Sequence, residues 1–329
     1  PWRWHVPVCV AAMEAGKHAA TEVPAAITLE GCWKLVETSE KTGKHCVMLE
    51  NCSYDRAELA VLNMARRGLL GELLHAEGGY MHELRRNLFS ETPQIYRLRH
   101  SIKRNENLYP THGLDPAARC LGVHHGDRFD RIVSMSTKSV CMNEYAAEKF
   151  GPDSPQARRD YACGDVNMSI IHTAKGCTIL VGFSTHTPRP YSRMFMVQGS
   201  KGIMRKYPEE KIHIEGKSPG HSWEDFKKYR EDYDHPIWTS LQERACGSGH
   251  GGIDFIENYR LIESLRRGVY PDMDVYDAAA VSAVGPLSGK SVAGGGGLVK
   301  FPDFTRGGWK NDGPPGGRLG AKDVATGKV

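Results

Sequence analysis

The sequence predicts an α/β fold in two parts: a parallel-sheet domain over residues 1–68, then an α+β domain with a mostly antiparallel open sheet over 69–310. The first part alternates between helical and strand-like patterns, which is typical of a parallel sheet with helices on both faces. In the second part strand-like segments follow one another, often separated by Gly or Lys-Gly turns. Residues 311–329 are rich in Gly and are expected to form a disordered tail.

The first part is expected to contain three helices and two strands. In chain order they cover residues 5–15, 17–23, 28–42, 47–49 and 54–67. Glycines at positions 16, 43 and 68 follow the three helical patterns, and glycine is the residue that most often ends a helix. Thr28 can cap the second helix through its hydroxyl oxygen.

The second part is expected to be dominated by strands, with a few helices at its borders. Strand-like segments cover residues 71–81, 129–139, 164–174, 177–186, 192–199 and 202–207. Helical patterns cover residues 111–123, 253–267 and 274–292. Ala174-Lys-Gly176 stands between two strand-like segments and predicts a hairpin turn.

The composition is that of an ordinary globular protein and excludes several classes of function. The chain has 329 residues, 40% hydrophobic and 25% charged, with a net charge of +4. Basic and acidic residues alternate, so we expect no nucleic-acid partner. No apolar stretch reaches the length of a membrane span, so we expect no membrane insertion. Nine cysteines without a Cys-x-x-Cys pair argue against a zinc site, and we expect buried free thiols and no metal.

Three pairs of polar residues are candidates for a site on residue chemistry alone, and the first of them follows a strand. Glu50 and Asn51 follow a predicted buried strand, at the edge where open α/β sheets bind ligands. The competing interpretation is a helix cap, with Asn51 or Ser53 capping the helix predicted from Tyr54.

Tyr80 and His82 are two apart on a predicted strand, so they share a face and could relay a proton. A buried pair without a catalytic role is equally compatible with that spacing.

Tyr109 and His112 form a third candidate pair at the start of a predicted helix, with Thr111 as a plausible cap. The helix dipole disfavours a cationic imidazole in the first turn, and a general base must be neutral.

A glycine-rich segment resembles a phosphate-binding motif only superficially. Gly247-Ser-Gly-His-Gly-Gly252 matches Gly-x-Gly-x-x-Gly only as a string. It follows a helix end rather than a strand, so we do not expect it to bind phosphate.

Five segments together resemble the signature segments of glycoside hydrolase family 109. They are Lys44-His-Cys-Val-Met-Leu-Glu-Asn-Cys-Ser-Tyr-Asp-Arg56, Gly79-Tyr-Met-His-Glu-Leu-Arg85, Asn107-Leu-Tyr-Pro-Thr-His-Gly113, Pro188-Arg-Pro-Tyr-Ser-Arg193 and Gly249-His-Gly-Gly-Ile-Asp254. The resemblance covers almost the whole chain. It implies an NAD-dependent α-N-acetylgalactosaminidase of the glucose-fructose oxidoreductase/inositol dehydrogenase superfamily, with a Rossmann-like first domain. It also implies that the Gly-rich phosphate loop of that domain, carried by family members in roughly their first third, is missing here.

The resemblance also implies roles for individual residues. The sugar pocket would consist of Glu50, Tyr80, Arg97, Tyr109, His112 and Tyr191, with His82 and the 249–254 loop close by. The cofactor side would contain Trp2, His5, Glu22, Asn51 and Tyr191. The catalytic groups would be His112 with Tyr109 at the 3-hydroxyl, and Tyr80 with His82 at C2 and the leaving group.

The chain departs from relatives at three positions. Val23 stands where many superfamily dehydrogenases have a lysine, and family 109 also lacks that lysine. Asp55 and Asp115 replace glycines that are usual in the family, which puts the identity of the substrate in doubt more than the reaction class.

The implied reaction is hydrolysis of a terminal α-N-acetylgalactosaminide, or of a related hexosaminide or hexoside, through transient oxidation at C3, elimination and addition of water. Two alternatives stay open: an NAD(P)-dependent sugar or cyclitol dehydrogenase of the same superfamily, and an inactive fragment. The expected partner is a small carbohydrate. The superfamily also implies a homo-oligomer paired through the open face of the second sheet, and export signals in many relatives suggest a periplasmic or secreted setting.

Overall fold

The computed structural model describes residues 1–90 and 96–311. Strands form two sheets: a parallel pair near the N-terminus and a nine-stranded sheet. The α/β class with a mostly antiparallel second sheet is therefore confirmed. The predicted disordered tail lies outside the described residues except for Asn311, which ends the 3-10 helix η5 (Gly308–Asn311).

The N-terminal unit consists of η1 (Trp2–Trp4), α1 (His5–Glu14), β1 (Ala19–Thr21), α2 (Leu29–Thr42) and β2 (Cys46–Met48). The two strands pair in parallel, as predicted. The Thr28 hydroxyl accepts a hydrogen bond from the backbone N–H of Gly31 at 3.0 Å, so Thr28 caps α2 as predicted. Gly43, with φ of 64°, ends the same helix in the left-handed region that glycine adopts at low cost.

The large sheet has the strand order β10-β9-β8-β7-β3-β6-β5-β4-β11. Its strands are β3 (Leu73–Met81), β4 (Phe129–Ser136), β5 (Asn167–Thr173), β6 (Thr178–Ser184), β7 (Met196–Gly199), β8 (Gly202–Arg205), β9 (Lys211–Ile214), β10 (Glu224–Asp225) and β11 (Val299–Lys300). Neighbours pair antiparallel except β3 and β6, which run parallel. The hairpin predicted at 174–176 joins β5 to β6. Strands β9, β10 and β11 were not predicted. With two residues each, β10 and β11 are too short to show an alternation, whereas Lys-Ile-His-Ile in β9 does alternate and was missed.

Four predicted helices occur close to their expected bounds: α3 (Arg56–Arg66), α6 (Thr111–Cys120), α10 (Ile253–Arg267) and α11 (Val275–Ala293). The prediction that Asn51 or Ser53 caps a helix from Tyr54 is wrong. Asp55 caps α3, its carboxylate accepting from the Ala57 N–H at 3.2 Å, while residues 51–54 form the separate 3-10 helix η2 (Asn51–Tyr54).

Four further helices were not predicted: α4 (Arg85–Phe89), α5 (Tyr96–Lys103), α7 (Cys141–Phe150) and α8 (Lys227–Tyr233). The helix end expected before Gly247 is confirmed, since α9 (Pro236–Ala245) ends there. The four unpredicted helices have ten residues or fewer and bury two residues or fewer each, so each one carries only a short stretch of core-facing pattern.

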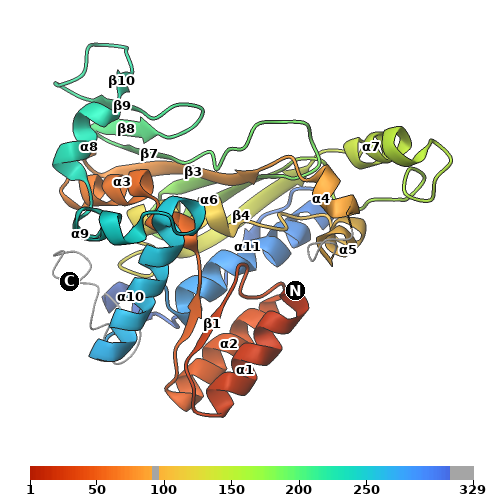
Figure 1. Cartoon of the computed structure of the whole chain (residues 1–329), viewed down its shortest axis with the longest axis horizontal. Coiled ribbons are helices and arrows are strands. Elements are labelled where there is room, and N and C mark those ends of the chain that lie inside the picture. Colours follow the sequence, from red (N-terminus) through yellow and green to blue (C-terminus); the bar gives the residue numbers. More distant parts are fainter. Residues whose placement is uncertain (91–95, 312–329) are drawn as a thin grey trace.

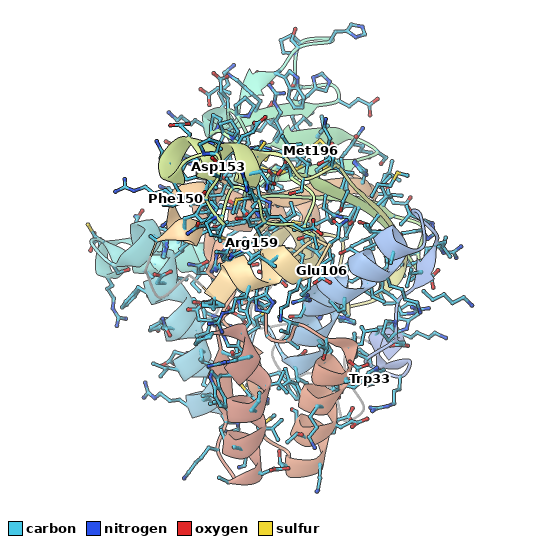
Figure 2. All side chains as sticks on the ribbon, turned by 90° about the vertical axis from the view of Figure 1, so that its right-hand side faces the viewer. Trp33, Glu106, Phe150, Asp153, Arg159 and Met196 are labelled. Carbon is cyan, nitrogen blue, oxygen red and sulfur yellow. The ribbon has the colours of Figure 1, made fainter. Side chains whose placement is uncertain are left out.

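Helix α11 joins the two sheets. It is buried along most of its length and packs against β4 on one side and against α2 and β2 on the other. Figure 1 shows α11 running below the large sheet, with α1, α2 and β1 below it. Figure 2 shows the same arrangement from the side, with Trp33 of α2 in the lower part and Met196 of β7 in the upper part. The boundary at residue 68 stays a prediction, since both parts share this helix.

Two glycines bring helix α6 into direct backbone contact with strand β3. A Cβ atom on Gly113 would lie 1.8 Å from the backbone nitrogen of Gly79, and one on Gly78 would lie 2.2 Å from the Gly113 carbonyl oxygen. Only glycine permits such an approach. As a consequence, the first turn of α6 lies against the end of β3, where the candidate residues are found.

No helix within residues 1–90 and 96–311 has the length and apolar character needed to cross a membrane.

Candidate functional site

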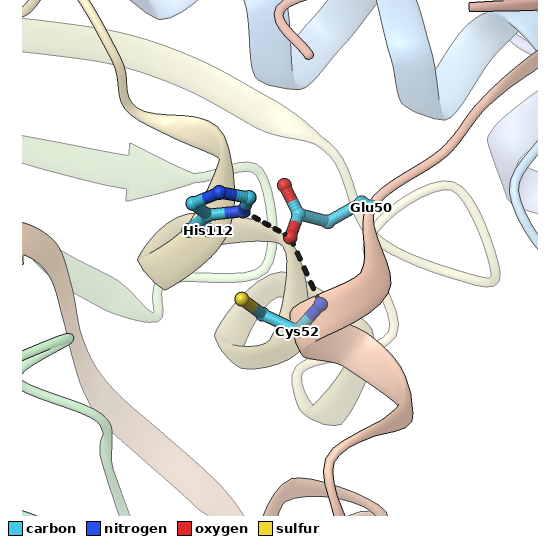
Figure 3. A group of neighbouring side chains, drawn as sticks. All are labelled: Glu50, Cys52 and His112. Atoms are coloured by element: carbon cyan, nitrogen blue, oxygen red, sulfur yellow. Dashed lines mark hydrogen bonds and ion pairs between the residues drawn. The ribbon is translucent and has the colours of Figure 1, made fainter. Parts of the chain in front are cut away.

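A buried carboxylate and an imidazole form the centre of the site. Glu50, which follows β2, is fully buried, and its Oε1 lies 2.6 Å from Nδ1 of His112 in the first turn of α6 (Figure 3). The same oxygen accepts a hydrogen bond from the Cys52 N–H at 3.2 Å, which fixes the carboxylate. Because a carboxylate oxygen accepts, Nδ1 carries the hydrogen and Nε2 is left for a ligand. The resemblance to family 109 put both residues in one pocket, but nothing in the sequence indicated a direct bond between residues 62 positions apart.

Aromatic rings surround this pair. Tyr80 lies 4.7 Å from Tyr109 and 5.5 Å from His112 between ring centroids, and Tyr109 lies 5.0 Å from His112. The Tyr191 ring completes the cluster, 6.1 Å from Tyr80 and 5.0 Å from His82. The structure therefore brings together the tyrosines and histidines expected in a sugar pocket. Aromatic walls with a few polar groups are typical of carbohydrate-sized ligand sites.

Tyr80 and His82 are hydrogen-bonded, as their spacing suggested. The Tyr80 hydroxyl lies 3.0 Å from His82 Nδ1. Burial raises the pKa of Tyr80, an effect that Arg97 partly offsets, while burial and then Arg97 lower the pKa of His82. A protonated phenol beside a neutral imidazole can donate to it, so the pair has the arrangement of a proton relay.

Arg97 and Trp2 form the wall behind Tyr109. The Arg97 guanidinium carbon lies 4.6 Å from the Tyr109 ring centroid and 5.5 Å from that of Trp2. The Trp2 ring stacks on Tyr109 at 5.9 Å. Trp2, expected on the cofactor side, thus lies directly behind the sugar-side tyrosine.

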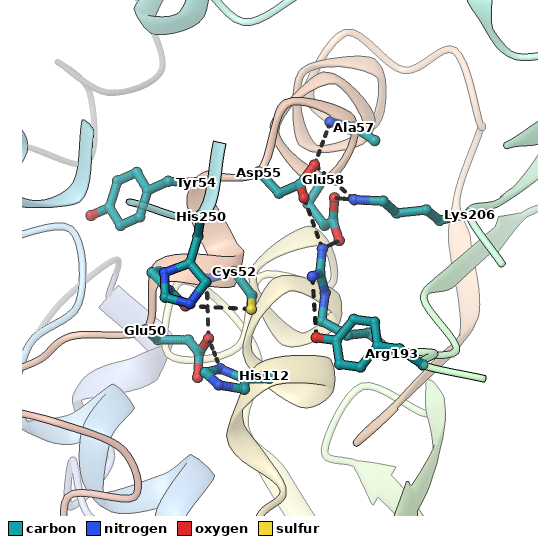
Figure 4. Close-up of polar contacts among 12 residues, drawn as sticks. Glu50, Cys52, Tyr54, Asp55, Ala57, Glu58, His112, Arg193, Lys206 and His250 are labelled. Atoms are coloured by element: carbon teal, nitrogen blue, oxygen red, sulfur yellow. Dashed lines mark hydrogen bonds and ion pairs between the residues drawn. The ribbon is translucent and has the colours of Figure 1, made fainter. Parts of the chain in front are cut away.

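A buried ion cluster holds the loop that carries Tyr191 (Figure 4). Arg193 Nη2 contacts Asp55 at 2.9 Å and Glu58 at 2.5 Å, and Lys206 contacts the same two carboxylates at 2.7 and 2.8 Å. Burial alone would raise the pKa of Asp55, but Lys206 and Arg193 outweigh it and hold that pKa below its usual range. Arg193 Nη1 also donates to the Tyr191 hydroxyl at 3.4 Å. Asp55 is therefore part of the support for Tyr191.

A second histidine–carboxylate pair lies at the rim. His250 Nδ1 is 2.8 Å from Asp254 Oδ2, and Asn51 donates to Asp254 Oδ1 at 2.8 Å. These two bonds hold the pKa of Asp254 below its usual value against the opposing effect of burial. Figure 4 shows the His250 ring over the segment that carries Glu50 and Cys52. Asn51 thus joins the rim pair to the segment of the buried pair; the resemblance had implied that the 249–254 loop lies close by, but not this bond.

The other two residues expected on the cofactor side lie apart from the aromatic cluster. His5 donates from Nδ1 to the Pro24 carbonyl at 2.9 Å, and burial lowers its pKa. Glu22 is exposed at the end of β1. The prediction that Thr111 caps α6 is wrong, because Pro110 occupies the cap position. Thr111 is the first residue of the helix, and its buried hydroxyl has no hydrogen-bond partner among the described residues.

Glu50, Cys52 and His112 are close enough to one another to raise the question of a metal. Their donor atoms lie within 4.8 Å of each other. Burial, followed by the charge of Glu50, raises the pKa of the Cys52 thiol well above its ordinary value. A protonated thiol and a hydrogen-bonded Nδ1 are poor metal ligands, so we interpret the trio as a hydrogen-bonded group.

Comparison with known protein families gives one match. Residues 54–311 match the family described as "Glycosyl hydrolase 109, C-terminal domain". A "Glycosyl hydrolase family 109 protein" of Solibacter usitatus is 48% identical over 316 residues, covering 95% of this chain and 72% of the relative. An "Alpha-N-acetylgalactosaminidase" of Shewanella oneidensis is 44% identical over 323 residues, covering 96% of this chain and 70% of the relative.

Solved structures share the fold. A levoglucosan dehydrogenase in complex with NADH and levoglucosan superimposes with a TM-score of 0.68 at 19% identity, over 92% of this chain and 78% of the other. An inositol dehydrogenase homolog from Azotobacter vinelandii, complexed with NADH and myo-inositol, gives 0.65 at 19% identity, over 91% and 75%. At this level of identity the similarity shows the fold alone.

Proposed function

Because the chain belongs to glycosyl hydrolase family 109 and is a glycoside hydrolase, we propose that it releases terminal N-acetylgalactosamine from α-glycosides with NAD as its bound cofactor. The name of the Shewanella oneidensis relative supports the sugar, and the NADH in the solved neighbours supports the cofactor. The observation that carries the proposal is the buried Glu50–His112 pair facing Tyr80 and Tyr109. A related hexosaminide or hexoside would suit the same pocket.

Buried polar atoms without partners fit a hydroxylated ligand. Glu50 Oε2 and Arg97 Nε are both buried and lack a hydrogen-bond partner within residues 1–90 and 96–311. Such atoms are rare in folded proteins because each one costs free energy. A sugar ring offers donors and acceptors for these atoms at the centre of the aromatic cluster.

The residues present also fit the nicotinamide end of NAD. Trp2, His5, Glu22, Asn51 and Tyr191 would hold it, and the orphaned Trp2 Nε1 is one donor for it. Bound NAD supplies reversible hydride acceptance from C3 of the sugar, which acidifies the hydrogen on C2. The 247–252 glycine string has no part in this, since it follows helix α9 rather than a strand.

His112 would take the proton of the 3-hydroxyl. Its Nδ1 is held by Glu50, so the free Nε2 can accept a proton while the adjacent carboxylate stabilises the imidazolium. Tyr109, in ring contact with His112, would orient the same hydroxyl. In this proposal His112 accepts the proton, and Tyr109 orients the hydroxyl that loses it.

Tyr80 and His82 would remove the C2 hydrogen as a unit. The raised pKa of Tyr80 means that the phenol carries its proton at neutral pH. As the phenol oxygen accepts the C2 proton, its own proton passes to His82 Nδ1, 3.0 Å away. The leaving group is then expelled from C1.

His250 would protonate the leaving group. Its Nδ1 is occupied by Asp254, so Nε2 is the free nitrogen, and the side chain is 70% exposed at the rim where an aglycone would leave. The same residue would deprotonate the water that adds back to C1, while Tyr80 and His82 return a proton to C2 and His112 returns one to the 3-oxygen.

Mass analysis of the released sugar tests the proposal. The protein is supplied with NAD and an aryl α-N-acetylgalactosaminide in heavy water, and we expect the released sugar to carry deuterium at C2. Release without deuterium would contradict the elimination route and point to direct displacement. Accumulation of NADH on free sugar without release of the aglycone would favour the dehydrogenase alternative.

The proposed partner besides the sugar is a second copy of the chain. On the large sheet Met135 is 68% exposed and Ile170 is 50% exposed. Ile170 pairs with Val133, two residues from Met135, so both apolar side chains share the uncovered face. Light scattering on the wild type and on Met135→Glu checks this pairing, with a shift towards monomer expected for the variant.

A further inference from the structure

Helix α10 presents one face to the segment that carries Glu50 and Asn51. Asp254, Glu257 and Arg260 are three residues apart, so they lie one above the other on this face. Asp254 accepts from Asn51, and Arg260 pairs with Asp272 at 2.7 Å, which in turn accepts from the Tyr54 hydroxyl at 3.1 Å. Glu257 therefore lies on the helix between Asp254, which binds Asn51 at the start of η2, and Arg260, which is linked through Asp272 to Tyr54 at its end.

Glu257 has one buried oxygen without a partner in the described part of the chain. The residue is only 6% exposed, and its Oε1 makes no hydrogen bond within residues 1–90 and 96–311. Its neighbours on the same face are both satisfied, by Asn51 and by Asp272. An unpaired buried carboxyl oxygen is costly and calls for a group that the protein itself does not supply.

The charges around Glu257 are mostly negative. Burial raises its pKa to about 9, followed by repulsion from other acids. The acids that raise its pKa by repulsion are Glu50, Glu22, Asp254 and Asp115. Glu257 in turn acts on the pKa of Tyr54, where burial comes first and Asp272, Arg119 and Arg260 also act. Arg260 is already occupied by Asp272, and Arg119 lies over the Tyr54 ring. At neutral pH the uncharged acid is the form that this environment favours.

We propose that Glu257 is a further binding residue of the site, which keeps its proton and donates it to an uncharged oxygen of the bound ligand. This inference rests on the proposed function, because that function puts a ligand beside Glu50. The acceptor could be a hydroxyl of the sugar or the carboxamide oxygen of NAD. A carboxylate or phosphate is excluded as the partner because Glu22, Glu50 and Asp254 would repel it.

The first test measures stability against pH without any ligand. A carboxyl group whose pKa is raised in the folded state contributes stability that is complete below its ordinary pKa of 4.5 and is lost as the pH rises to about 9. Glu257→Gln has no proton to lose. We therefore expect its melting temperature to exceed that of the wild type by a margin that grows between about pH 5 and about pH 9. Glu263→Gln, on the same helix, is the control: this side chain is 15% exposed and already paired with Arg266 and Arg267, so it should show no such trend.

The second test measures binding of NAD and of N-acetylgalactosamine in separate calorimetric titrations. Glu257→Leu removes the hydrogen bond at similar volume, and we expect about tenfold weaker binding of one of the two probes at neutral pH. Glu257→Gln keeps an N–H donor, so its affinity for that probe should stay close to that of the wild type. Above about pH 9 the wild type should lose affinity through ionisation of Glu257, whereas Glu257→Gln should not. The probe that responds identifies which ligand Glu257 contacts.

Three results would overturn the inference. Equal affinity of Glu257→Leu and the wild type for both probes would show that Glu257 makes no hydrogen bond to either ligand. Superimposable pH–stability curves for Glu257→Gln and the wild type would show that Glu257 is not held in the protonated form. Failure of the wild type to bind either probe would contradict this inference and also the proposed binding of NAD and N-acetylgalactosamine. By contrast, normal probe binding without deuterium incorporation would contradict only the proposed mechanism.

Discussion

The site contains two histidine–carboxylate pairs of similar geometry in opposite surroundings. His112 and Glu50 are 2.6 Å apart, with side chains 16% and 0% exposed. His250 and Asp254 are 2.8 Å apart, with side chains 70% and 34% exposed. In both pairs the carboxylate binds Nδ1 and leaves Nε2 available.

The difference lies in the backbone that carries each pair. His112 begins a helix that is pressed against β3 through glycine contacts, so its position is fixed by two regular elements. His250 has φ of 51° and is followed by Gly251 and Gly252 with φ of 74° and 104°, in a loop ahead of α10. The comparison indicates that the buried pair sets a fixed geometry, while the rim pair can adjust to leaving groups of different size.

Loss of the buried pair should have the largest effect. We expect His112→Gln to lower kcat by about 100- to 10,000-fold, since a positioned general base contributes that much. Glu50→Gln should lose much of the same activity because His112 then lacks the carboxylate that orients it, so the two changes should not be additive. Steady-state kinetics of the single and double variants measure this. An additive double variant would contradict a functional pair, and His213→Gln, far away on β9, serves as the control.

Loss of the rim histidine should have a smaller effect that depends on the substrate. For His250→Ala we expect kcat to fall by about 10- to 100-fold on an alkyl glycoside and much less on an aryl glycoside with an acidic leaving group. The reason is that a good leaving group departs without protonation. Equal losses on both substrates would contradict the role of His250 as an acid at the leaving group.

Stiffening the rim loop should have the smallest effect. Gly251 has φ of 74° with open space around its Cβ position, so Gly251→Ala should cost about 1 to 2 kcal/mol through backbone strain alone. Gly268, with φ of 64° at the other end of α10 and equally open space, is the matched control. We expect similar losses in melting temperature for both variants, and a few-fold change in turnover for Gly251→Ala only. A matching change in turnover for Gly268→Ala would show that the loop has no special part in catalysis.

The sequence predicted those parts of the molecule that depend on local pattern. Thr28 and Gly43 bounded α2 correctly because a cap and a left-handed glycine act within one turn. The Tyr80–His82 contact followed from the period of a strand. Local pattern also led to the wrong caps at Thr111 and Ser53, since Pro110 and Asp55 occupy those positions.

Contacts between segments far apart in the chain could not be predicted from local sequence pattern. The Glu50–His112 bond and the Asn51–Asp254 bond join residues 62 and 203 positions apart. The resemblance to family 109 named Glu50, Tyr109, His112 and Tyr191 as one pocket, and the structure gathers them. Glu257 gave no signal at all, because an acid within a helical pattern is normally interpreted as solvated surface.

The contact between Gly79 and Gly113 has a consequence for redesign of the enzyme. Because the two backbones touch, the helix with His112 cannot be shifted along the strand with Tyr80, so the two side chains that we propose for proton transfer keep their spacing. Changes in the accepted sugar must therefore come from the other walls, formed by Arg97 and Tyr191, which rest on side-chain contacts. A library confined to those walls would vary recognition while the reacting groups keep their separation.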